Sequence, residues 1–419
     1  MITKLRKIYH EYPRQFWLLI AAFFVDMVGN ALVWPFFALF LTDKYDIGLR
    51  EVGVLMGVYS LAGLVGGAVG GALADRMGRK PILLVGLLAS ATGNLAFVLV
   101  GEFALLYVVA VTLGVLGSVG GPAAQAMMAD LLPEEQRAEG YSIMRVEFNL
   151  AVTIGPMLGG LLAGVSYVLL FSIDALTSVI TAVVLLVALR ETRPETTESA
   201  EPETLVETFR GYGEVLRDVP FMLFVLLGLL VSLVYHQMNN TLPVYMRDAH
   251  GYKPYWFGLL LTINAAIVVL TQFWVTRRVR RYPRLLVMAA SALVYAVGFG
   301  MYGFVAGFAL FVVAMVIITV GEMMLVPVSQ AMAADFAKEH MRGRYMAVFG
   351  FSFSIASALG TWLAGVVIDA WGHNWVWYLS GMGGVLAAAG YVWLHLRFNP
   401  AERPDPSFDA GSLPEVAVS

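Results

Sequence analysis

The hydrophobic residues of this chain lie in long stretches that short polar segments separate. A helix needs about 20 apolar residues to cross a bilayer, and each stretch is about that long or longer. Six stretches precede residue 190 and six follow residue 218, at residues 15–41, 51–74, 81–100, 103–128, 141–164, 167–189, 219–246, 255–275, 284–305, 307–333, 343–368 and 374–396. The pattern predicts an all-α membrane protein with twelve transmembrane helices in two six-helix bundles.

The polar segment 190–218 divides the two sets of stretches. It is acidic, rich in threonine and contains proline, which is typical of a solvated linker. Its residues 205–216 are expected to form a short surface helix. We therefore predict an N-terminal bundle over 1–189, this linker, a C-terminal bundle over 219–398, and a disordered tail over 399–419. The first stretch lacks a small-residue cleavage site, so we interpret it as a retained helix rather than a signal peptide.

Composition excludes several classes of protein. Hydrophobic residues make up 59% of the 419 residues and charged residues only 14%, against about 25% charged in soluble proteins. Cysteine is absent, which excludes disulfides and thiolate metal sites. We find no phosphate-binding loop, metal-ligand cluster or nucleophile–base pair. We therefore expect no enzyme, no cofactor, no metal and no nucleic-acid partner.

The positive charges indicate how the chain is oriented. Of the 27 lysines and arginines, 22 lie in the segments on the side of the N-terminus, four lie in the opposite loops, and Arg145 lies near the start of a helix. Because basic loops remain in the cytoplasm, both termini are expected to be cytoplasmic. We predict a multi-pass protein of the plasma (inner) membrane that acts as a monomer.

The two halves repeat each other at an offset of 205 residues. The offset aligns Pro122, Gln125, Ala126, Met127, Asp130, Arg137, Gly155 and Gly160 with Pro327, Gln330, Ala331, Met332, Asp335, Arg342, Gly360 and Gly365. Internal repeats are typical of secondary transporters, which bind their substrate near the membrane midplane between the halves.

Two motifs resemble those of the major facilitator superfamily and of its drug:proton antiporter branch. Residues 71–80 read GALADRMGRK, similar to the signature between helices 2 and 3, with Gly71, Asp75, Arg76, Gly78, Arg79 and Lys80 at its positions. Residues Gly155, Pro156, Gly159 and Gly160 resemble the end of the antiporter signature on helix 5. Its upstream glycines are Ser142 and Ala151 here, and the arginine that the family places on helix 4 is absent from that helix, whereas helix 5 carries Arg145.

The resemblance implies a gate at residues 71–80, which we call the gating loop. Asp75 would contact the N-terminal end of helix 11, and Arg76 would pair with Asp130 on helix 4, so that the halves are held in an outward-open state. A simpler interpretation is that the loop only marks topology, as any basic hairpin would. The repeat of this loop, residues 276–281, keeps its positive charge but lacks the aspartate and the glycines.

Four carboxylates fall within predicted membrane helices: Asp26, Glu147, Asp174 and Glu322. A charge at the membrane centre costs about 2.5–3.5 kcal/mol, so each needs a partner, water or a proton. We predict proton coupling at these four residues and at His236, and contact with a cationic substrate at Glu322. The alternative for each acid is a structural hydrogen bond, and for Asp174 a packing role.

Several polar and aromatic residues are candidates to line a substrate cavity. The segment 234–241 is the most polar stretch within any predicted span, and polar runs in membrane helices usually face water. The segment is also close to the outer end of its helix, so the alternative is that these residues are polar only because they lie at the membrane interface. The predicted lining residues are Asn30, Trp34, Phe37, Tyr235, His236, Asn239, Asn240, Glu322 and Trp362.

The sequence thus favours a proton-coupled antiporter that exports amphipathic, often cationic, drugs by alternating access, with a small-molecule substrate, protons and membrane lipid as its partners. A specific exporter of a sugar, lipid or metabolite has the same predicted fold. A non-transporting membrane receptor is a third alternative, although no large soluble domain is present to transmit a signal.

Overall fold

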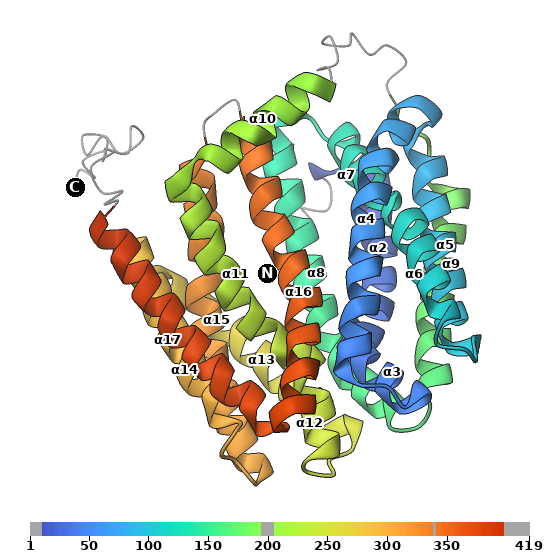
Figure 1. Ribbon diagram of the computed structural model, residues 1–419. Coiled ribbons are helices and arrows are strands. Elements are labelled where there is room, and N and C mark those ends of the chain that lie inside the picture. The colour runs from blue at the N-terminus through green and yellow to red at the C-terminus, as the bar shows by residue number, and fades with distance from the viewer. Residues whose placement is uncertain (1–10, 194–204, 338–340, 398–419) are drawn as a thin grey trace, which may run out of the picture.

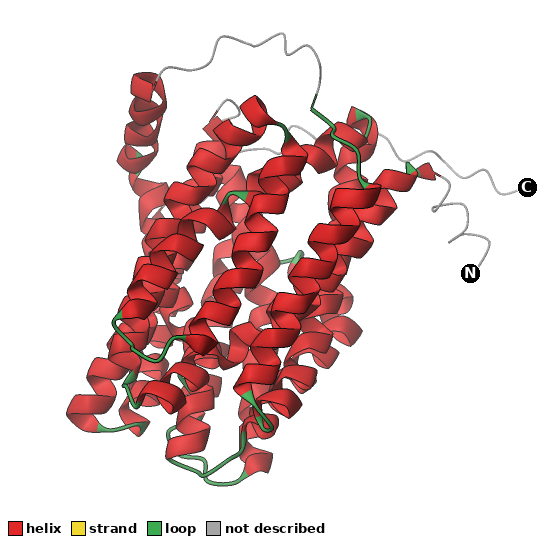
Figure 2. Cartoon of the chain, turned by 90° about the vertical axis from the view of Figure 1, so that its right-hand side faces the viewer, coloured by secondary structure: helices red, strands yellow, loops and turns green. Residues whose placement is uncertain are grey.

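A computed structural model describes residues 11–193, 205–337 and 341–397. Every regular element that these residues form is a helix (Figure 2). Twelve segments of the described chain are long and apolar enough to cross a membrane, in agreement with the predicted fold. The predicted tail, residues 399–419, lies outside the described residues.

The first half contains the spans predicted from the sequence. Its elements are α2 (Arg14–Val33), the 3-10 turn η1 (Trp34–Phe36), α3 (Phe37–Tyr45), α4 (Leu49–Met77), α5 (Arg79–Leu99), α6 (Leu105–Ser118), α7 (Gly120–Leu131), α8 (Glu134–Ala163) and α9 (Tyr167–Ala188).

The second half begins with the expected linker helix. Its elements are α10 (Leu205–Arg217), α11 (Val219–Asn240), α12 (Leu242–Asp248), α13 (Pro254–Val279), α14 (Arg284–Met301), α15 (Phe308–Phe336), α16 (Arg342–Trp371) and α17 (Asn374–Arg397).

Three predicted helices are interrupted rather than continuous. The first changes to a 3-10 turn that contains Pro35, because proline has no N–H to donate within a helix. The fourth breaks between Ser118 and Gly120. The seventh ends at Asn240, and Pro243 then lies in the first turn of the separate helix α12. Hydrophobicity alone does not mark these breaks, since the apolar pattern continues across them.

The helices form two bundles that pack against each other along two pairs, α4 with α16 and α8 with α13. We call the end of the molecule with α10 the linker end and the opposite end the far end. In Figure 1, α4 and α16 lie close together at the far end and diverge toward the linker end.

Glycines allow the bundles to touch at the far end. A Cβ atom at Gly53 of α4 would lie 2.4 Å from the backbone nitrogen of Trp362 of α16, and one at Gly160 of α8 would lie 3.0 Å from the Cα atom of Gly258 of α13. The Nη1 atom of Arg247 in α12 lies 3.7 Å from the Oδ1 atom of Asp43 in α3. The far end of the interface is therefore closed in this conformation.

The glycine motif on α8 serves both bundles. Gly160 packs against Gly258 of the other bundle. Gly155 and Gly159 instead pack within their own bundle, where a Cβ would lie 2.4 Å from Ala31 Cβ and 2.3 Å from the Leu32 carbonyl oxygen, respectively. The motif thus joins the first helix and the opposite bundle to one short segment of α8.

A Gly160→Leu substitution is expected to separate the bundles at the far end, because its side chain would meet the backbone of Gly258. The chain has no native cysteine, so spin labels can be placed on cysteines introduced at the exposed far-end positions Glu102 and Phe304. Electron resonance should report a longer distance in the variant. Gly121→Leu is the matched control, since a Cβ at Gly121 meets no atom within 4 Å; equal distances in both variants would contradict the prediction.

Candidate functional site

The Glu322 carboxyl group joins three helices of the C-terminal bundle. Its Oε1 atom accepts a hydrogen bond of 2.9 Å from the Tyr235 hydroxyl of α11, and its Oε2 atom accepts one of 2.9 Å from the Asn264 amide of α13. Asn264 also donates to Thr319, one turn before Glu322 on α15. The sequence predicts Glu322 and Tyr235 as site residues, but Asn264 was not a candidate because it is a single polar residue in an apolar stretch.

Glu322 has neutral donors and no positive partner. Among the residues that the structure describes, no lysine, arginine or histidine forms an ion pair with it. Gly321 lets α15 approach α14 closely at this point, since a Cβ there would lie 2.7 Å from the ring of Tyr295 on α14. That ring in turn stacks on Tyr235. When ionised, the carboxylate therefore has no compensating charge, which favours binding of a proton or a cation.

The rest of the polar run on α11 mainly joins α11 to α16. Asn240 is 3% exposed and donates to the Thr361 hydroxyl at 2.6 Å, and Gln237 donates to the Gly360 carbonyl. Asn240 is thus packed between α11 and α16 in this conformation. His236 packs edge-on against Phe353 of α16, and its Nε2 atom is buried without a hydrogen-bond partner.

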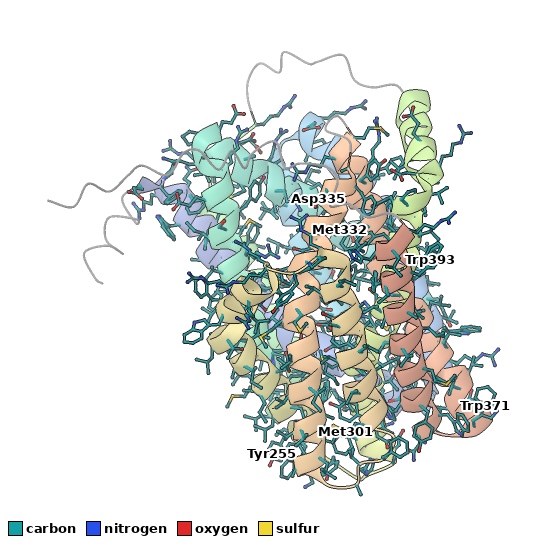
Figure 3. All side chains as sticks on the ribbon, turned by 90° about the vertical axis from the view of Figure 1, so that its left-hand side faces the viewer. Tyr255, Met301, Met332, Asp335, Trp371 and Trp393 are labelled. Carbon is teal, nitrogen blue, oxygen red and sulfur yellow. The ribbon has the colours of Figure 1, made fainter. Side chains whose placement is uncertain are left out.

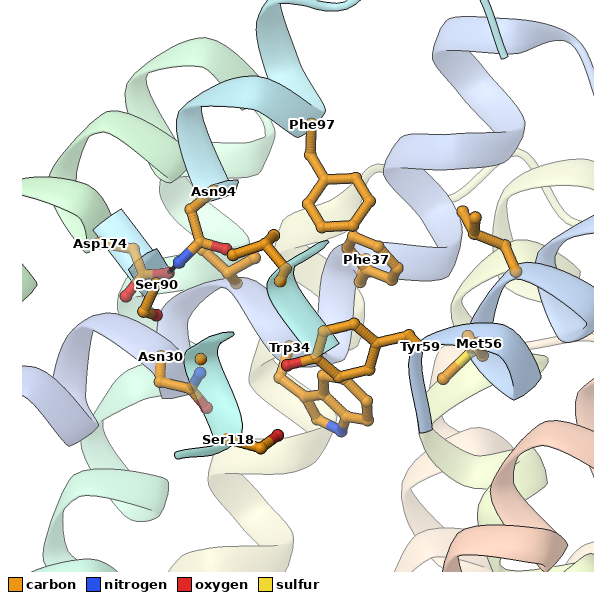
Figure 4. A pocket seen from close by; sticks show the side chains of 14 residues that line it. Asn30, Trp34, Phe37, Met56, Tyr59, Ser90, Asn94, Phe97, Ser118 and Asp174 are labelled. Atoms are coloured by element: carbon orange, nitrogen blue, oxygen red, sulfur yellow. Dashed lines mark hydrogen bonds between the residues drawn. The ribbon is translucent and has the colours of Figure 1, made fainter. Parts of the chain in front are cut away.

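A cavity of about 230 Å³ lies within the N-terminal bundle (Figure 4). Four predicted site residues line it: Asn30, Trp34, Phe37 and Asp174. The remaining lining residues come from α2, α4, α5 and α6, and are Val33, Leu55, Met56, Tyr59, Ser90, Asn94, Phe97, Leu113, Gly117 and Ser118. Its wall is therefore aromatic on one side and polar on the other.

Two predicted lining residues lie elsewhere. Trp362 packs at the far-end contact between α16 and α4. Asn239 lies on α11 and is half-buried. The predicted residues therefore fall into two separate groups, one in each bundle, rather than in one cluster.

Three carboxyl groups lie near one another in the N-terminal bundle. Asp174, 2% exposed, accepts from Asn94 at 2.6 Å, and Asp26 accepts from Ser178 at 2.6 Å. Asp26 is close enough to Asp174 and to Glu147 for direct charge–charge interaction. Glu147 is 9% exposed and its Oε1 atom is buried without a partner. Because like charges repel in a medium of low dielectric constant, ionisation of one of these carboxyl groups disfavours ionisation of the next.

Arg79, rather than Arg76, is the central charge of the gating loop. Its guanidinium group lies 3.1 Å from Asp130 and 3.0 Å from Asp75, and it is buried. The predicted pair of Arg76 with Asp130 is therefore not formed in this conformation. Asp75 is 71% exposed and pairs with Arg79 instead of the start of α16 at Arg342. Arg76 and Arg79 lie three residues apart in the gating loop, and only the packing of the loop selects which of them meets Asp130.

The second half keeps this ion pair at the repeat offset. Arg284 at the start of α14 pairs with Asp335 near the end of α15, and both residues lie 205 positions after Arg79 and Asp130. Figure 3 shows Asp335 toward the linker end of α15. The repeat thus extends to the contacts that join these helices.

Glu191, which follows α9, binds the gating loop, and no pattern in the sequence indicates this contact. Its carboxylate accepts hydrogen bonds from the backbone N–H groups of Arg79, Lys80, Thr192 and Arg193. Partial burial raises the pKa of Glu191, but these four hydrogen bonds outweigh it and hold the pKa below its ordinary value. The start of the linker is therefore attached to the gating loop and to the first turn of α5.

A Glu191→Gln substitution is expected to lower the melting temperature of the protein at neutral pH. Because the folded-state pKa is depressed, this stabilisation is present above the ordinary glutamate pKa of about 4.3 and is lost as the pH falls through the folded value. The difference between wild type and variant should therefore shrink in acid. The exposed Glu102→Gln is the control, and a difference that does not change with pH would contradict this account.

Comparison with known proteins supports one family. Residues 19–323 and 256–416 match the model of the Major Facilitator Superfamily. The chain is 30% identical over 411 residues to a Na(+), Li(+), K(+)/H(+) antiporter of Planococcus maritimus, covering 90% of this chain and 94% of that protein. It is 24% identical over 287 residues to the quinolone resistance protein NorA of Staphylococcus aureus (strain MSSA476), covering 68% and 72%.

Solved structures share the fold at low sequence identity. A crystal structure of the nucleoside transporter NupG superposes with a TM-score of 0.78 at 12% identity, covering 91% of this chain and 100% of that chain. Identity at this level supports the arrangement of helices and carries no information on the substrate.

Proposed function

The chain belongs to the Major Facilitator Superfamily of secondary transporters, and from that premise we propose that it exports amphipathic, often cationic, compounds in exchange for entering protons. It is a multi-pass membrane protein and not an enzyme. The 22 to four distribution of lysines and arginines supports a cytoplasmic linker end. The closed far end then corresponds to an inward-facing conformation.

The Glu322 carboxyl group is the observation that carries this proposal. It lies within a membrane helix, it is half-buried, and its partners are the neutral groups of Tyr235 and Asn264. A carboxylate in that setting is stabilised by either a proton or a cationic substrate, but not by both at once. Competition between these two occupants is the simplest basis for antiport.

The N-terminal acids would then act as a second proton-binding group. Asp26, Glu147 and Asp174 lie on α2, α8 and α9, and α8 packs against α13 of the opposite bundle. A change in their protonation could therefore bias how the bundles pack, since the same helix carries Glu147 and the far-end contact at Gly160. The similarity to a quinolone resistance protein is consistent with a drug as cargo.

Antiport of monovalent metal cations against protons is the second candidate function. Asp174 and the neighbouring polar residues of the cavity wall favour it, as does the similarity to a Na(+), Li(+), K(+)/H(+) antiporter. The described residues contain no group of three acidic or histidine side chains placed to hold a metal ion. A bound cation would therefore rely on one carboxylate, such as Asp174, and on neutral oxygens.

Transport by the purified full-length protein in proteoliposomes tests these functions. A pH gradient is imposed, and cationic, neutral and anionic dyes are compared with Na⁺, K⁺ and Li⁺, with a protonophore as control. We expect several unrelated cationic dyes to move against the proton flux. Movement of metal cations alone would favour the second candidate, movement of one compound alone would favour a specific exporter, and no proton-linked movement at all would overturn the proposal.

A further inference from the structure

The connection between α13 and α14 carries an unusual density of positive charge. Residues 277–284 contain five arginines, and all five are exposed. Arg284 pairs with Asp335. Within the described part of the chain the others, Arg277, Arg278, Arg280 and Arg281, form no ion pair.

Comparison with the gating loop shows how the two repeats differ. In the first half, Arg79 is neutralised by Asp75 and Asp130, and Lys80 donates to the carbonyl groups at the end of α9. At the repeat offset of 205 residues, the position of Asp75 is occupied by Arg280. The second loop therefore keeps the ion pair that joins its helices but replaces the acid with another base.

Apolar rings lie directly beside these arginines. Phe273 and Trp274, on the preceding turn of α13, are 70% and 74% exposed. Together with Arg277, Arg278 and Arg281 they line a surface hollow of about 420 Å³. Exposed tryptophan beside clustered arginine is typical of the boundary between the acyl chains and the headgroups of a bilayer.

We propose that this hollow binds a phospholipid with an anionic headgroup, such as phosphatidylglycerol, from the leaflet at the linker end. The guanidinium groups of Arg277, Arg278 and Arg281 would hold the phosphate, since arginine binds phosphate oxygens in a bidentate way. Phe273 and Trp274 would contact the acyl chains. Topology and the helix dipole explain positive charge at a helix end, but neither requires two exposed aromatic rings next to the charges.

Fluorescence of Trp274 provides a direct test. The full-length protein is reconstituted in phosphatidylcholine bilayers that contain brominated phosphatidylglycerol, or in phosphatidylglycerol bilayers that contain brominated phosphatidylcholine. The chain has nine tryptophans, so the Trp274→Phe variant supplies the signal to subtract. We expect the Trp274 component to be quenched several-fold more efficiently by the brominated anionic lipid than by the zwitterionic one at equal mole fraction.

Variants test whether the preference for the anionic lipid comes from this hollow or from the positive charge of the protein in general. The combined Arg277→Gln, Arg278→Gln and Arg281→Gln variant should lose the preference. A control that removes three exposed arginines outside the lining of the hollow, Arg217→Gln, Arg280→Gln and Arg397→Gln, should keep it.

Three results would overturn the proposal. One is equal quenching by both lipids in the wild type, and another is an equal loss of preference in the two triple variants. The third is displacement of the lipid by millimolar inorganic phosphate, which would show that the hollow binds free phosphate rather than a lipid. Unchanged melting temperatures of the variants would show that they are folded.

Discussion

A Glu322→Gln substitution is expected to abolish proton-coupled efflux, to the level of protein-free liposomes, while the protein still folds and inserts. Glutamine has nearly the same shape as glutamate and can still accept from Tyr235, but it cannot release a proton. It also has no negative charge with which to hold a cationic substrate. The measurement is dye transport in proteoliposomes under an imposed pH gradient, together with the melting temperature as a check of folding.

The matched control is Glu102→Gln, which makes the same chemical change at an exposed loop position. It should transport as the wild type does. A Glu322→Gln protein that still couples efflux to the pH gradient would remove Glu322 as the coupling acid and would direct attention to Asp26, Glu147 and Asp174. Downhill substrate exchange without a gradient would show separately whether the variant still binds its cargo.

An Arg79→Gln substitution is expected to reduce transport strongly and to destabilise the N-terminal bundle. Arg79 is 8% exposed and forms ion pairs with both Asp75 and Asp130. Its removal leaves the largely buried Asp130 carboxylate without an ion pair, which costs roughly 1–3 kcal/mol. Transport rate and melting temperature are the two measurements.

The adjacent arginine is the control. Arg76 is exposed, so Arg76→Gln removes the same charge from the same loop and is expected to have a small effect. If Arg76→Gln were instead the more damaging variant, the Asp130 pair seen here would not be the contact on which the gate depends. The pair of variants thus separates a specific contact from a general need for positive charge in the gating loop.

Glu322 could be predicted as a site residue from the sequence, but the set of residues that hydrogen-bond to it could not. Glu322 stands out because an acid in an apolar span is expensive. Its partners Tyr235 and Asn264 are 87 and 58 residues away along the chain, and no periodicity connects them. Glu191 was missed for the same reason, since an acid in a polar linker has no distinguishing sequence signal until its backbone partners are placed.

The number of spans, the duplication and the asymmetry of the two basic loops can be inferred from the sequence alone, because hydrophobic length, repeat spacing and charge are read directly along the chain. The three-dimensional packing is needed to see that Arg79 pairs with Asp130, that Asn240 packs against α16, and that Asp26 and Asp174 accept hydrogen bonds from Ser178 and Asn94. These facts depend on which faces of separate helices meet. A helix of 3.6 residues per turn presents several polar residues in different directions, and only the packing of its neighbours determines which of them meet.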